Sequence, residues 1–301
     1  MAGRAPFTAK LMIVQIYEIQ TPHEAERCIV LGVDRLGSVL LSEEEWKNSD
    51  IREVIRLSEG TRTRNSLIPL FQTRDTLYRA MDYYRPYFLH LCESLTDDKG
   101  HVLDLSPFIN LQKDFKNKFP EIHVVRSIPV PEQGKAADFP VLQIAEAFKA
   151  ASDGFLIDTW LGREPVEGFI GITGKLADRD LSKKLVGWSS IPVILAGGLS
   201  PDNVHDAVIA IVPAGADSCS QTNLVNGGGQ PFRFRKDFGK VDAFVREVRR
   251  ADALLREEKT GLERKLHPLK ARARKGKNVA GARLEEEIAL IERELERYRW
   301  A

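Results

Sequence analysis

Residues 192–204 read PVILAGGLSPDNV and combine an apolar run, two glycines and the start of a helix. The apolar run leads directly into Gly197 and Gly198, and Ser200 is expected to cap a helix with Pro201 in its first turn. Glycines let the backbone approach a ligand closely, and free N–H groups at a helix start attract an anion. The stretch therefore predicts a phosphate-binding turn, with a plain capped βα turn as the alternative.

On both sides of this stretch, short apolar runs alternate with amphipathic segments up to about residue 240. The strands are predicted at residues 12–17, 34–41, 66–71, 87–92, 123–130, 154–159, 192–196 and 216–219. Eight such β-then-α units predict an α/β fold, the closed (β/α)8 TIM barrel, which typically takes about 250 residues. An open doubly wound sheet is the alternative, because it serves six strands as well as eight.

Beyond residue 240 the strand-like runs stop and the pattern predicts a helical extension that Pro268 interrupts. The second part of this extension carries a heptad-like apolar seam made of Leu284, Ile288, Ile291, Leu295 and Tyr298. We expect a barrel domain over residues 1–250 and a helical hairpin or coiled-coil-like tail over 251–301. The tail could form a homodimer, or it could fold back as a lid or cover.

Composition excludes several classes of protein. The 301 residues carry 44 Lys and Arg against 43 Asp and Glu, and this net charge of +1 argues against a nucleic-acid partner. The three cysteines form no CxxC pair, which argues against a disulfide scaffold or zinc ribbon and fits a reducing compartment. The apolar run near the start is too short for a signal or membrane segment. We therefore expect a cytoplasmic location and no membrane partner.

Two further signals precede the glycine pair. Residues 171–175, GITGK, form a polar, glycine-containing loop, but the GxxxxGK[ST] spacing of a P-loop is absent. Asp158 ends the apolar run of the predicted strand at 154–159. An unpaired charge is costly in a core, whereas at the mouth of a barrel it is typical of a catalytic or binding residue. The alternative is an aspartate that caps the following loop.

The order and spacing of these motifs resemble phosphoribosylanthranilate isomerase, the (β/α)8 enzyme of tryptophan biosynthesis, over residues 12–248. Residues 195–204 are similar to its LAGGLxPxNV phosphate motif, 171–175 to its GGTGK loop, and 215–220 to the strand and loop that complete the phosphate site. The resemblance implies that Asp158 is a general acid. It also implies that phosphate is held by Gly174, Gly197, Gly198 and Ser220.

The sequence departs from that family at the other end of the site. The family's first strand ends in KICGIT with a cysteine base, whereas residues 15–20 read QIYEIQ and place Tyr17 there. The arginine of the family's SPR segment, which helps to hold the aromatic carboxylate, is absent from LSEEEW at 41–46. The family's QLHG and SSGVE correspond to HLCE at 90–93 and CSQTN at 219–223. The scaffold and phosphate site are expected to be retained and the anthranilate end replaced.

The base is the least defined catalytic group. A phenol with a pKa near 10 is only ~0.1% ionised at neutral pH, so Tyr17 is a weak candidate. Glu18 is the better base if an apolar mouth raises its pKa. Strand alternation, however, puts Glu18 on the opposite face from Tyr17 unless the strand has already ended. Asp158, Glu18 and Tyr17 are the candidate catalytic residues.

We expect an Amadori-type aldose–ketose isomerase that acts on a phosphorylated sugar-type substrate, but not on phosphoribosylanthranilate itself. The alternatives are lyase or aldolase chemistry on a related sugar phosphate, and a non-catalytic phosphometabolite-binding protein that uses its tail for interaction. The candidate substrate-binding residues are Cys92, Arg126, Thr173 and Gln221, with Arg126 expected to neutralise a phosphate or carboxylate. His90 and Cys92 share one strand face, but two ligands do not make a metal site, so no metal and no cofactor is predicted.

Overall fold

The computed structural model describes residues 11–135, 138–275 and 281–301. Its strands are β1 (Ile13–Ile16), β2 (Arg35–Leu40), β3 (Arg64–Pro69), β4 (Phe88–Leu91), β5 (His123–Pro131), β6 (Gly154–Trp160), β7 (Val193–Leu195) and β8 (Gly215–Ser218). The helices that follow them are α1 (Pro22–Val30), α2 (Ser49–Ser58), α3 (Arg74–Tyr84), α4 (Ser106–Lys118), α5 (Val141–Lys149), α6 (Arg179–Trp188), α7 (Val204–Ile211) and α8 (Phe238–Lys275). Each of these strands overlaps its predicted range.

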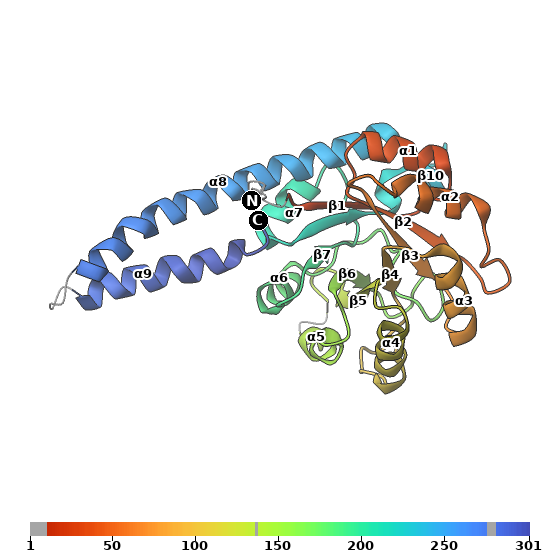
Figure 1. The fold of residues 1–301 in the computed structure, drawn as a ribbon, viewed down its shortest axis with the longest axis horizontal. Coiled ribbons are helices and arrows are strands. Elements are labelled where there is room, and N and C mark those ends of the chain that lie inside the picture. Colours follow the sequence, from red (N-terminus) through yellow and green to blue (C-terminus); the bar gives the residue numbers. More distant parts are fainter. Residues whose placement is uncertain (1–10, 136–137, 276–280) are drawn as a thin grey trace, which may run out of the picture.

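The strands close into a parallel barrel in sequence order, and the helices surround it (Figure 1). Closure is made by β1, which pairs with β2 on one side and with β8 on the other. The predicted TIM barrel is therefore confirmed. The open-sheet alternative is wrong because β1 pairs with β8, whereas in an open sheet the two edge strands stay unpaired on one side.

Local signals explain where the helices begin. Thr21 caps α1 because its side chain accepts a hydrogen bond from the N–H of Glu24, as its place before Pro22 indicates. The predicted cap of α7 is wrong, because that helix begins at Val204 rather than near Ser200. The side chain of Asn203 accepts from the N–H of Ser200 and donates to the carbonyl of Gly198, which holds this segment as a turn.

The side chains of the strands alternate between two apolar regions. One face packs under the helices, as Val14 of β1 and Phe155 of β6 do in the largest buried cluster. The other face fills the barrel interior, where Ile13, Val125 and Leu156 pack together. Because side chains fill the interior, a ligand can enter this fold at the barrel mouth, where the strands end.

Two features of the C-terminal part differ from the prediction. A two-stranded antiparallel hairpin, β9 (Asn223–Val225) and β10 (Pro231–Lys236), follows β8 and was not predicted. Helix α8 runs without a break through Pro268, so the predicted interruption there is wrong. Pro268 lies on the exposed side of the helix, where water can satisfy the carbonyl that loses its partner. The division at residue 250 stays a prediction, and α8 crosses that position as one helix.

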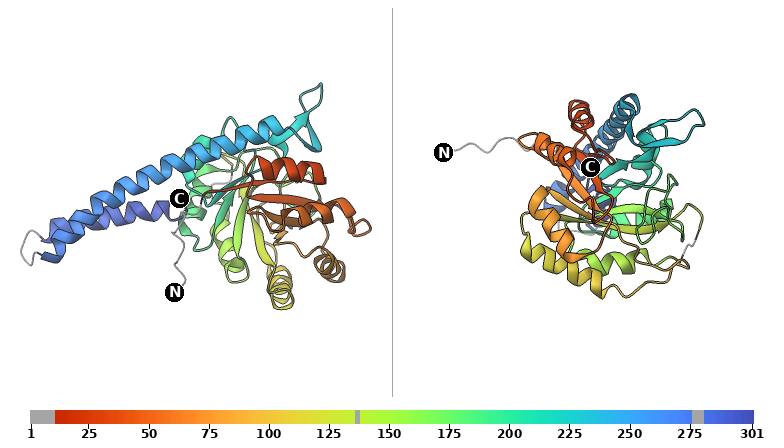
Figure 2. Two further views of the ribbon diagram at one scale, coloured as in Figure 1. Left: turned by 45° about the horizontal axis from the view of Figure 1, so that its top comes forward. Right: turned by 90° about the vertical axis from the view of Figure 1, so that its right-hand side faces the viewer.

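Helix α9 (Gly281–Leu295) turns back along α8, and both extend away from the barrel as a hairpin (Figures 1 and 2). The final residues return to the barrel: Tyr298 is buried there, and Arg299 donates to the carbonyl of Ser189. A groove beside the hairpin is lined by residues at the beginnings of β1, β7 and β8. The hairpin therefore lies at the end opposite the mouth, and the expectation of a lid over the site is wrong.

Among the described residues, none of the helices combines the length and the apolar character needed to span a lipid bilayer.

Candidate active site

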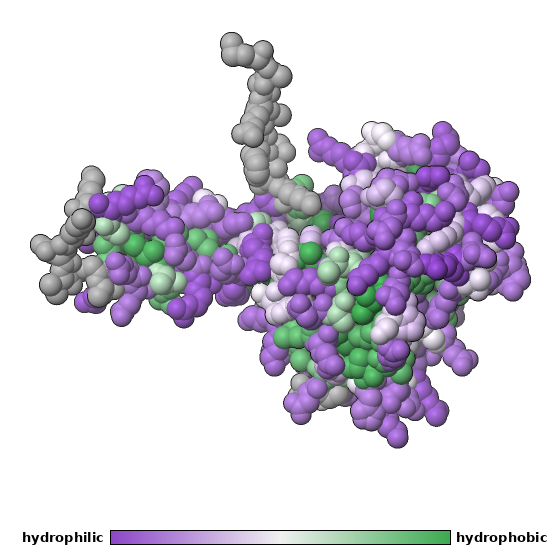
Figure 3. All heavy atoms as spheres, turned by 60° about the horizontal axis from the view of Figure 1, so that its bottom comes forward, coloured by the Kyte–Doolittle hydropathy of each residue, from purple (hydrophilic) through white to green (hydrophobic). Residues whose placement is uncertain are grey.

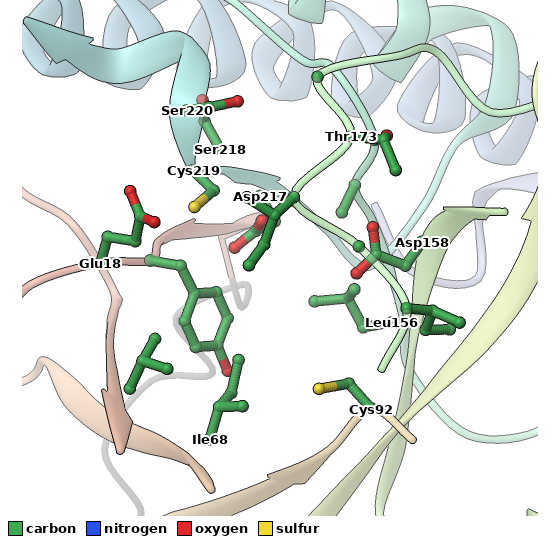
Figure 4. A pocket seen from close by; sticks show the side chains of 18 of the residues that line it. Glu18, Ile68, Cys92, Leu156, Asp158, Thr173, Asp217, Ser218, Cys219 and Ser220 are labelled. Carbon is green, nitrogen blue, oxygen red and sulfur yellow. The ribbon is translucent and has the colours of Figure 1, made fainter. Parts of the chain in front are cut away.

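A cavity of about 790 Å³, counted with its opening, lies at the carboxyl ends of the barrel strands (Figure 4). Its wall contains ten of the eleven predicted site residues, and Arg126 is not part of it. The lining residues that were predicted are Tyr17, Glu18, Cys92, Asp158, Thr173, Gly174, Gly197, Gly198, Ser220 and Gln221.

The segment from Val166 to Lys175, between β6 and α6, crosses the mouth of the cavity. At its first end, the N–H of Ile170 donates to the carbonyl of Cys92 over 2.8 Å. At its other end, the hydroxyl of Thr159 donates to the carbonyl of Lys175 over 2.7 Å. The segment is thus fixed to both β4 and β6, and it forms one wall of the site.

The glycines of the cavity are required by backbone shape and by close packing. Gly174, Gly197 and Gly198 have φ of +64°, +87° and +62°, a region that other residues rarely adopt. A Cβ on Gly198 would lie 2.8 Å from the carbonyl carbon of Lys175, so this glycine lets the two mouth loops touch. The predicted turn at residues 195–204 therefore meets the predicted loop at 171–175 in space.

These loops also provide hydrogen-bond donors. In the described parts of the chain, the N–H groups of Gly174, Gly198 and Ser220 donate to no protein acceptor. All three residues line the cavity, together with the partly buried side chains of Thr173 and Gln221. Unpaired backbone N–H groups that converge on a cavity are suited to an anion such as a phosphate.

Asp158 ends β6 and projects into the cavity (Figure 4). Burial, with the nearby Asp217 carboxyl as a second cause, raises the pKa of Asp158 to about 8. One carboxylate oxygen accepts from the N–H of Thr159, and Gly171 packs directly against the carboxyl group. At neutral pH Asp158 is therefore mostly protonated and able to donate a proton, as a general acid requires.

Asp217, on β8, is a second cavity carboxyl that the sequence analysis did not single out (Figure 4). Burial raises its pKa to about 7, although the amide of Gln15 donates to it over 3.0 Å and Lys236 favours its charged form. The signal was present in residues 215–220, which were interpreted only as part of a phosphate site. Two neighbouring carboxyls whose pKa values are both raised toward neutrality can act as an acid and base pair.

Tyr17 does not have the properties of a base. Its hydroxyl lies 2.7 Å from Ser66 Oγ and 2.7 Å from His90 Nδ1, within the barrel. Burial raises the pKa of Tyr17 well above its ordinary value, so the phenol stays protonated. The ring also occupies the space that a side chain on Gly37 would fill, which explains how the barrel accommodates a residue this large.

Glu18 is ionised and already bound by the protein. It lies just beyond β1 at φ +62°, and its carboxylate accepts from Asn223 over 2.7 Å and from Arg233 over 2.9 Å. Burial acts to raise its pKa, but the hydrogen bond from Asn223 and the charges of Lys236 and Arg233 lower it below the ordinary value. The expectation that an apolar mouth raises the Glu18 pKa is wrong, because cations of β10 surround the carboxylate.

Arg126 does not reach the cavity, which contradicts its predicted contact with substrate. Its guanidinium donates to Glu93 over 2.6 Å and stacks over Phe148 on the outer side of β5. The reason is strand alternation: Ser127 faces the interior, where it contacts His90, so Arg126 faces the helices.

His90 and Cys92 both line the cavity, whereas Glu93 points to the other face of the strand. His90 is inside the barrel, where burial lowers its pKa to about 3 and keeps the ring neutral. Cys92 lines the cavity as a thiol, because burial raises its pKa well above the ordinary value, and Glu93 pairs with Arg126. No group of three potential metal ligands occurs among the residues that the structure describes.

The fold and the site define a TIM barrel with an anion cradle and two carboxyl groups at its mouth. The sequence is similar to curated enzymes of one kind. The N-(5'-phosphoribosyl)anthranilate isomerase 1 of Methanosarcina mazei is 25% identical over 244 residues, which are 80% of this chain and 97% of that enzyme. The corresponding enzyme of Methanocella arvoryzae is 28% identical over 247 residues, 78% of this chain and 97% of its own length. No protein-family model matches the chain.

Solved structures give the same result for the fold. A phosphoribosyl anthranilate isomerase in complex with reduced 1-(o-carboxyphenylamino)-1-deoxyribulose 5-phosphate superposes with a TM-score of 0.56 at 16% identity. The match covers 79% of this chain and 98% of that one. The resemblance drawn from the motifs is thus confirmed: the chain is similar in sequence and in fold to phosphoribosylanthranilate isomerases.

Proposed function

We propose that the protein is an isomerase of N-substituted phosphosugar amines and that Asp158 and Asp217 transfer the protons. The observation that carries the proposal is the placement of both carboxyls in one cavity with the donors of Gly174, Gly198 and Ser220. The donors suit a phosphate, and the carboxyls suit acid–base chemistry beside it.

The proposed reaction is an Amadori-type rearrangement in which each carboxyl has one role. Asp158 gives its proton to the ring oxygen of the sugar while the bond between C1 and that oxygen breaks. The nitrogen lone pair then forms a C1=N iminium ion. The Asp217 carboxylate removes the proton from C2, and the electrons of that bond form an enaminol. Return of a proton to C1, with loss of the enaminol hydroxyl proton, gives the ketose.

Asp217 replaces Glu18 and Tyr17 as the base in this proposal. Its pKa of about 7 leaves a substantial ionised fraction at neutral pH, when Asp158 still holds its proton. Glu18 is ionised too, but the hydrogen bonds from Asn223 and Arg233 occupy its oxygens. Burial raises the pKa of Tyr17 well above its ordinary value, so the phenol is protonated at neutral pH.

Imine-forming aldolase chemistry, an alternative from the sequence, has no support in the cavity. Such a reaction needs a lysine amine as nucleophile. Lys175 lies in the mouth segment but is not part of the cavity wall, and Lys236 donates instead to Asn223 and to the carbonyl of Cys219. The non-catalytic alternative is separated from the isomerase by the turnover experiment that closes the Discussion.

The phosphate part of the proposal is tested by calorimetric titration with ribulose 5-phosphate and with ribulose. We expect the phosphate to strengthen binding by about tenfold or more, because it adds charge-assisted hydrogen bonds to the cradle. Gly198→Val should remove about tenfold or more of the affinity, because its side chain enters the contact between the two mouth loops.

Gly187→Ala is the matched control, since a Cβ there meets no neighbouring atom and the residue lies in α6, away from the cavity. Circular dichroism establishes that each variant is folded. Unchanged affinity of a folded Gly198→Val protein would remove the phosphate assignment, and equal binding of ribulose and ribulose 5-phosphate would do so as well.

A further inference from the structure

The cavity has an apolar end that the proposed reaction does not use. Three buried residues, Cys92, Phe169 and Ile170, pack there against the partly buried Ile68, Leu70 and Val166. They come from the ends of β3 and β4 and from the first part of the mouth segment. An apolar wall of this kind stabilises an apolar group by removing its surface from water.

The mouth segment fixes the order of the three parts of the cavity. Phe169 and Ile170 belong to the apolar end, Gly171 packs against the carboxyl of Asp158, and Gly174 lies beside Ser220. Figure 4 shows the same order, with Ser220 at one end, Asp158 and Asp217 between, and Cys92 at the other end. A phosphosugar amine has its parts in this order: phosphate, sugar carbons and the substituent on nitrogen.

The electrostatics of the apolar end oppose an acidic substituent. In the proposed reaction Asp217 is ionised. Its carboxylate projects into the adjacent part of the cavity, where a second negative charge in low-dielectric surroundings is repelled strongly. Two arginines beside the site are already paired, Arg126 with Glu93 and Arg233 with Glu18. No Lys or Arg among the described residues lines the cavity. A carboxylate there would be desolvated without a partner, which is costly.

We infer that the substrate carries an uncharged, apolar substituent on its nitrogen, such as an aryl or alkyl group, and that this group binds between Leu70, Cys92 and Phe169. The inference rests on the proposed function and specifies its substrate class. It separates this chain from an enzyme whose substrate carries an acid at that position.

The test uses two ligands that differ in a single group. One is 1-anilino-1-deoxyribulose 5-phosphate, and the other is the same compound with an ortho carboxylate on its ring. Their dissociation constants are measured by calorimetric titration of the full-length protein, with ribulose 5-phosphate as the reference. We expect the anilino compound to bind about tenfold or more tightly than the carboxylate compound, and more tightly than the reference. Equal or tighter binding of the carboxylate compound would overturn the inference.

A variant that adds a positive charge to the apolar wall makes the test independent of ligand size. Leu70 is partly exposed, so a lysine there can extend its ammonium group toward the opening while its stem stays on the wall. Leu70→Lys should tighten binding of the carboxylate compound by about tenfold, and Leu70→Met, of similar size and uncharged, should keep the wild-type preference. If Leu70→Lys is folded and does not shift the preference, the placement of the substituent at Leu70 is wrong.

Different results of this experiment contradict the inference about the nitrogen substituent and the proposed function. Binding of both compounds and of ribulose 5-phosphate, without preference for the anilino compound, contradicts the inference and leaves the phosphosugar site in place. Failure of all three compounds to bind contradicts the proposed function, and the inference with it.

Discussion

The carboxylate of Glu18 accepts a 2.9 Å hydrogen bond from Nε of Arg233, which joins the end of β1 to the β9–β10 hairpin. Glu18 is almost fully buried, and Asn223 donates to its other oxygen. A residue at the barrel mouth with φ +62° is thereby held by a hairpin that is more than 200 residues away in the sequence. We therefore expect Glu18 to contribute to stability rather than to proton transfer.

The first prediction concerns Glu18→Gln. The amide presents N–H donors to the donors of Arg233 and Asn223, so we expect the free energy of unfolding to fall by about 1–3 kcal/mol at neutral pH. Because the folded state lowers the Glu18 pKa, this stabilisation is present above about pH 4.3 and is lost as the pH falls further. Urea unfolding at pH 7 and near pH 4 measures it.

Glu53→Gln is the control, since the pair of Glu53 and Arg56 is exposed and its loss should change the free energy of unfolding much less. A Glu18→Gln protein as stable as the wild type, or one that loses turnover without losing stability, would return Glu18 to the list of bases.

The second prediction is an energetic coupling between Tyr17 and Gly37. The Tyr17 ring fills the space next to Gly37, so Gly37→Ala should destabilise the wild-type barrel by about 3 kcal/mol. In a Tyr17→Ala background the same change should cost much less, with a coupling energy of about 2 kcal/mol in a double-mutant cycle. Additive effects of the two changes would contradict the observed packing.

The third prediction is a narrow pH optimum. Asp217 must be ionised and Asp158 protonated, so kcat/KM should rise through an apparent pKa of about 7 and fall through one of about 8. These values belong to the interacting pair rather than to either residue alone. Asp217→Asn should lower kcat by about a hundredfold or more and remove the acidic limb. If the pH profile of the Asp217→Asn protein keeps its acidic limb, a residue other than Asp217 is the base.

The same pKa shift predicts that Asp158 reduces stability at high pH. Its pKa is raised in the folded state, so ionisation favours unfolding, and the folded state loses stability as the pH rises from about 4 to 8. We expect Asp158→Asn to raise the free energy of unfolding by about 1–3 kcal/mol at pH 9 and by much less near pH 4. A variant with the same stability difference at both pH values would show that the carboxyl is not raised in pKa.

The fourth prediction concerns the tail, for which a homodimer through the C-terminal helices stays an expectation. Packing of α9 against α8 covers only part of its apolar seam, because Ile288 and Ile291 stay partly exposed. Leu290, outside the seam, is 62% exposed. Hydrophobic side chains gather along the hairpin in Figure 3. Light scattering after gel filtration should give a dimer for the full chain and a monomer after truncation at Lys259. If the full chain and the truncated chain have the same oligomeric state, the tail is not a dimer contact.

Much of the fold could be predicted from local signals. An apolar run followed by the glycine pair at 197–198 has few other interpretations, and Thr21 before Pro22 marks a helix start by itself. The β9–β10 hairpin was missed even though its turn contains residues 226–229, NGGG, because its strands are short and largely polar.

The site could be predicted only where chemistry lies within one motif. The loops at 171–175 and 195–204 were placed correctly in the cavity because each carries its own glycines. The environment of Glu18 depends on Arg233 and Asn223, and that of Arg126 on Glu93, and no local pattern reports such distant partners. Asp217 was passed over because its raised pKa arises from burial, which a four-residue strand does not reveal.

The central claim is that Asp158 acts as the acid in isomerisation of a phosphosugar amine. The direct measurement is proton NMR of N-phenylribosylamine 5-phosphate during incubation with the wild-type protein, Asp158→Asn, and the exposed-site control Asp206→Asn. The account predicts conversion to 1-anilino-1-deoxyribulose 5-phosphate by the wild type and the control, and a loss of rate of about a hundredfold or more in Asp158→Asn. No conversion by the wild type, or equal rates for wild type and Asp158→Asn, would contradict it.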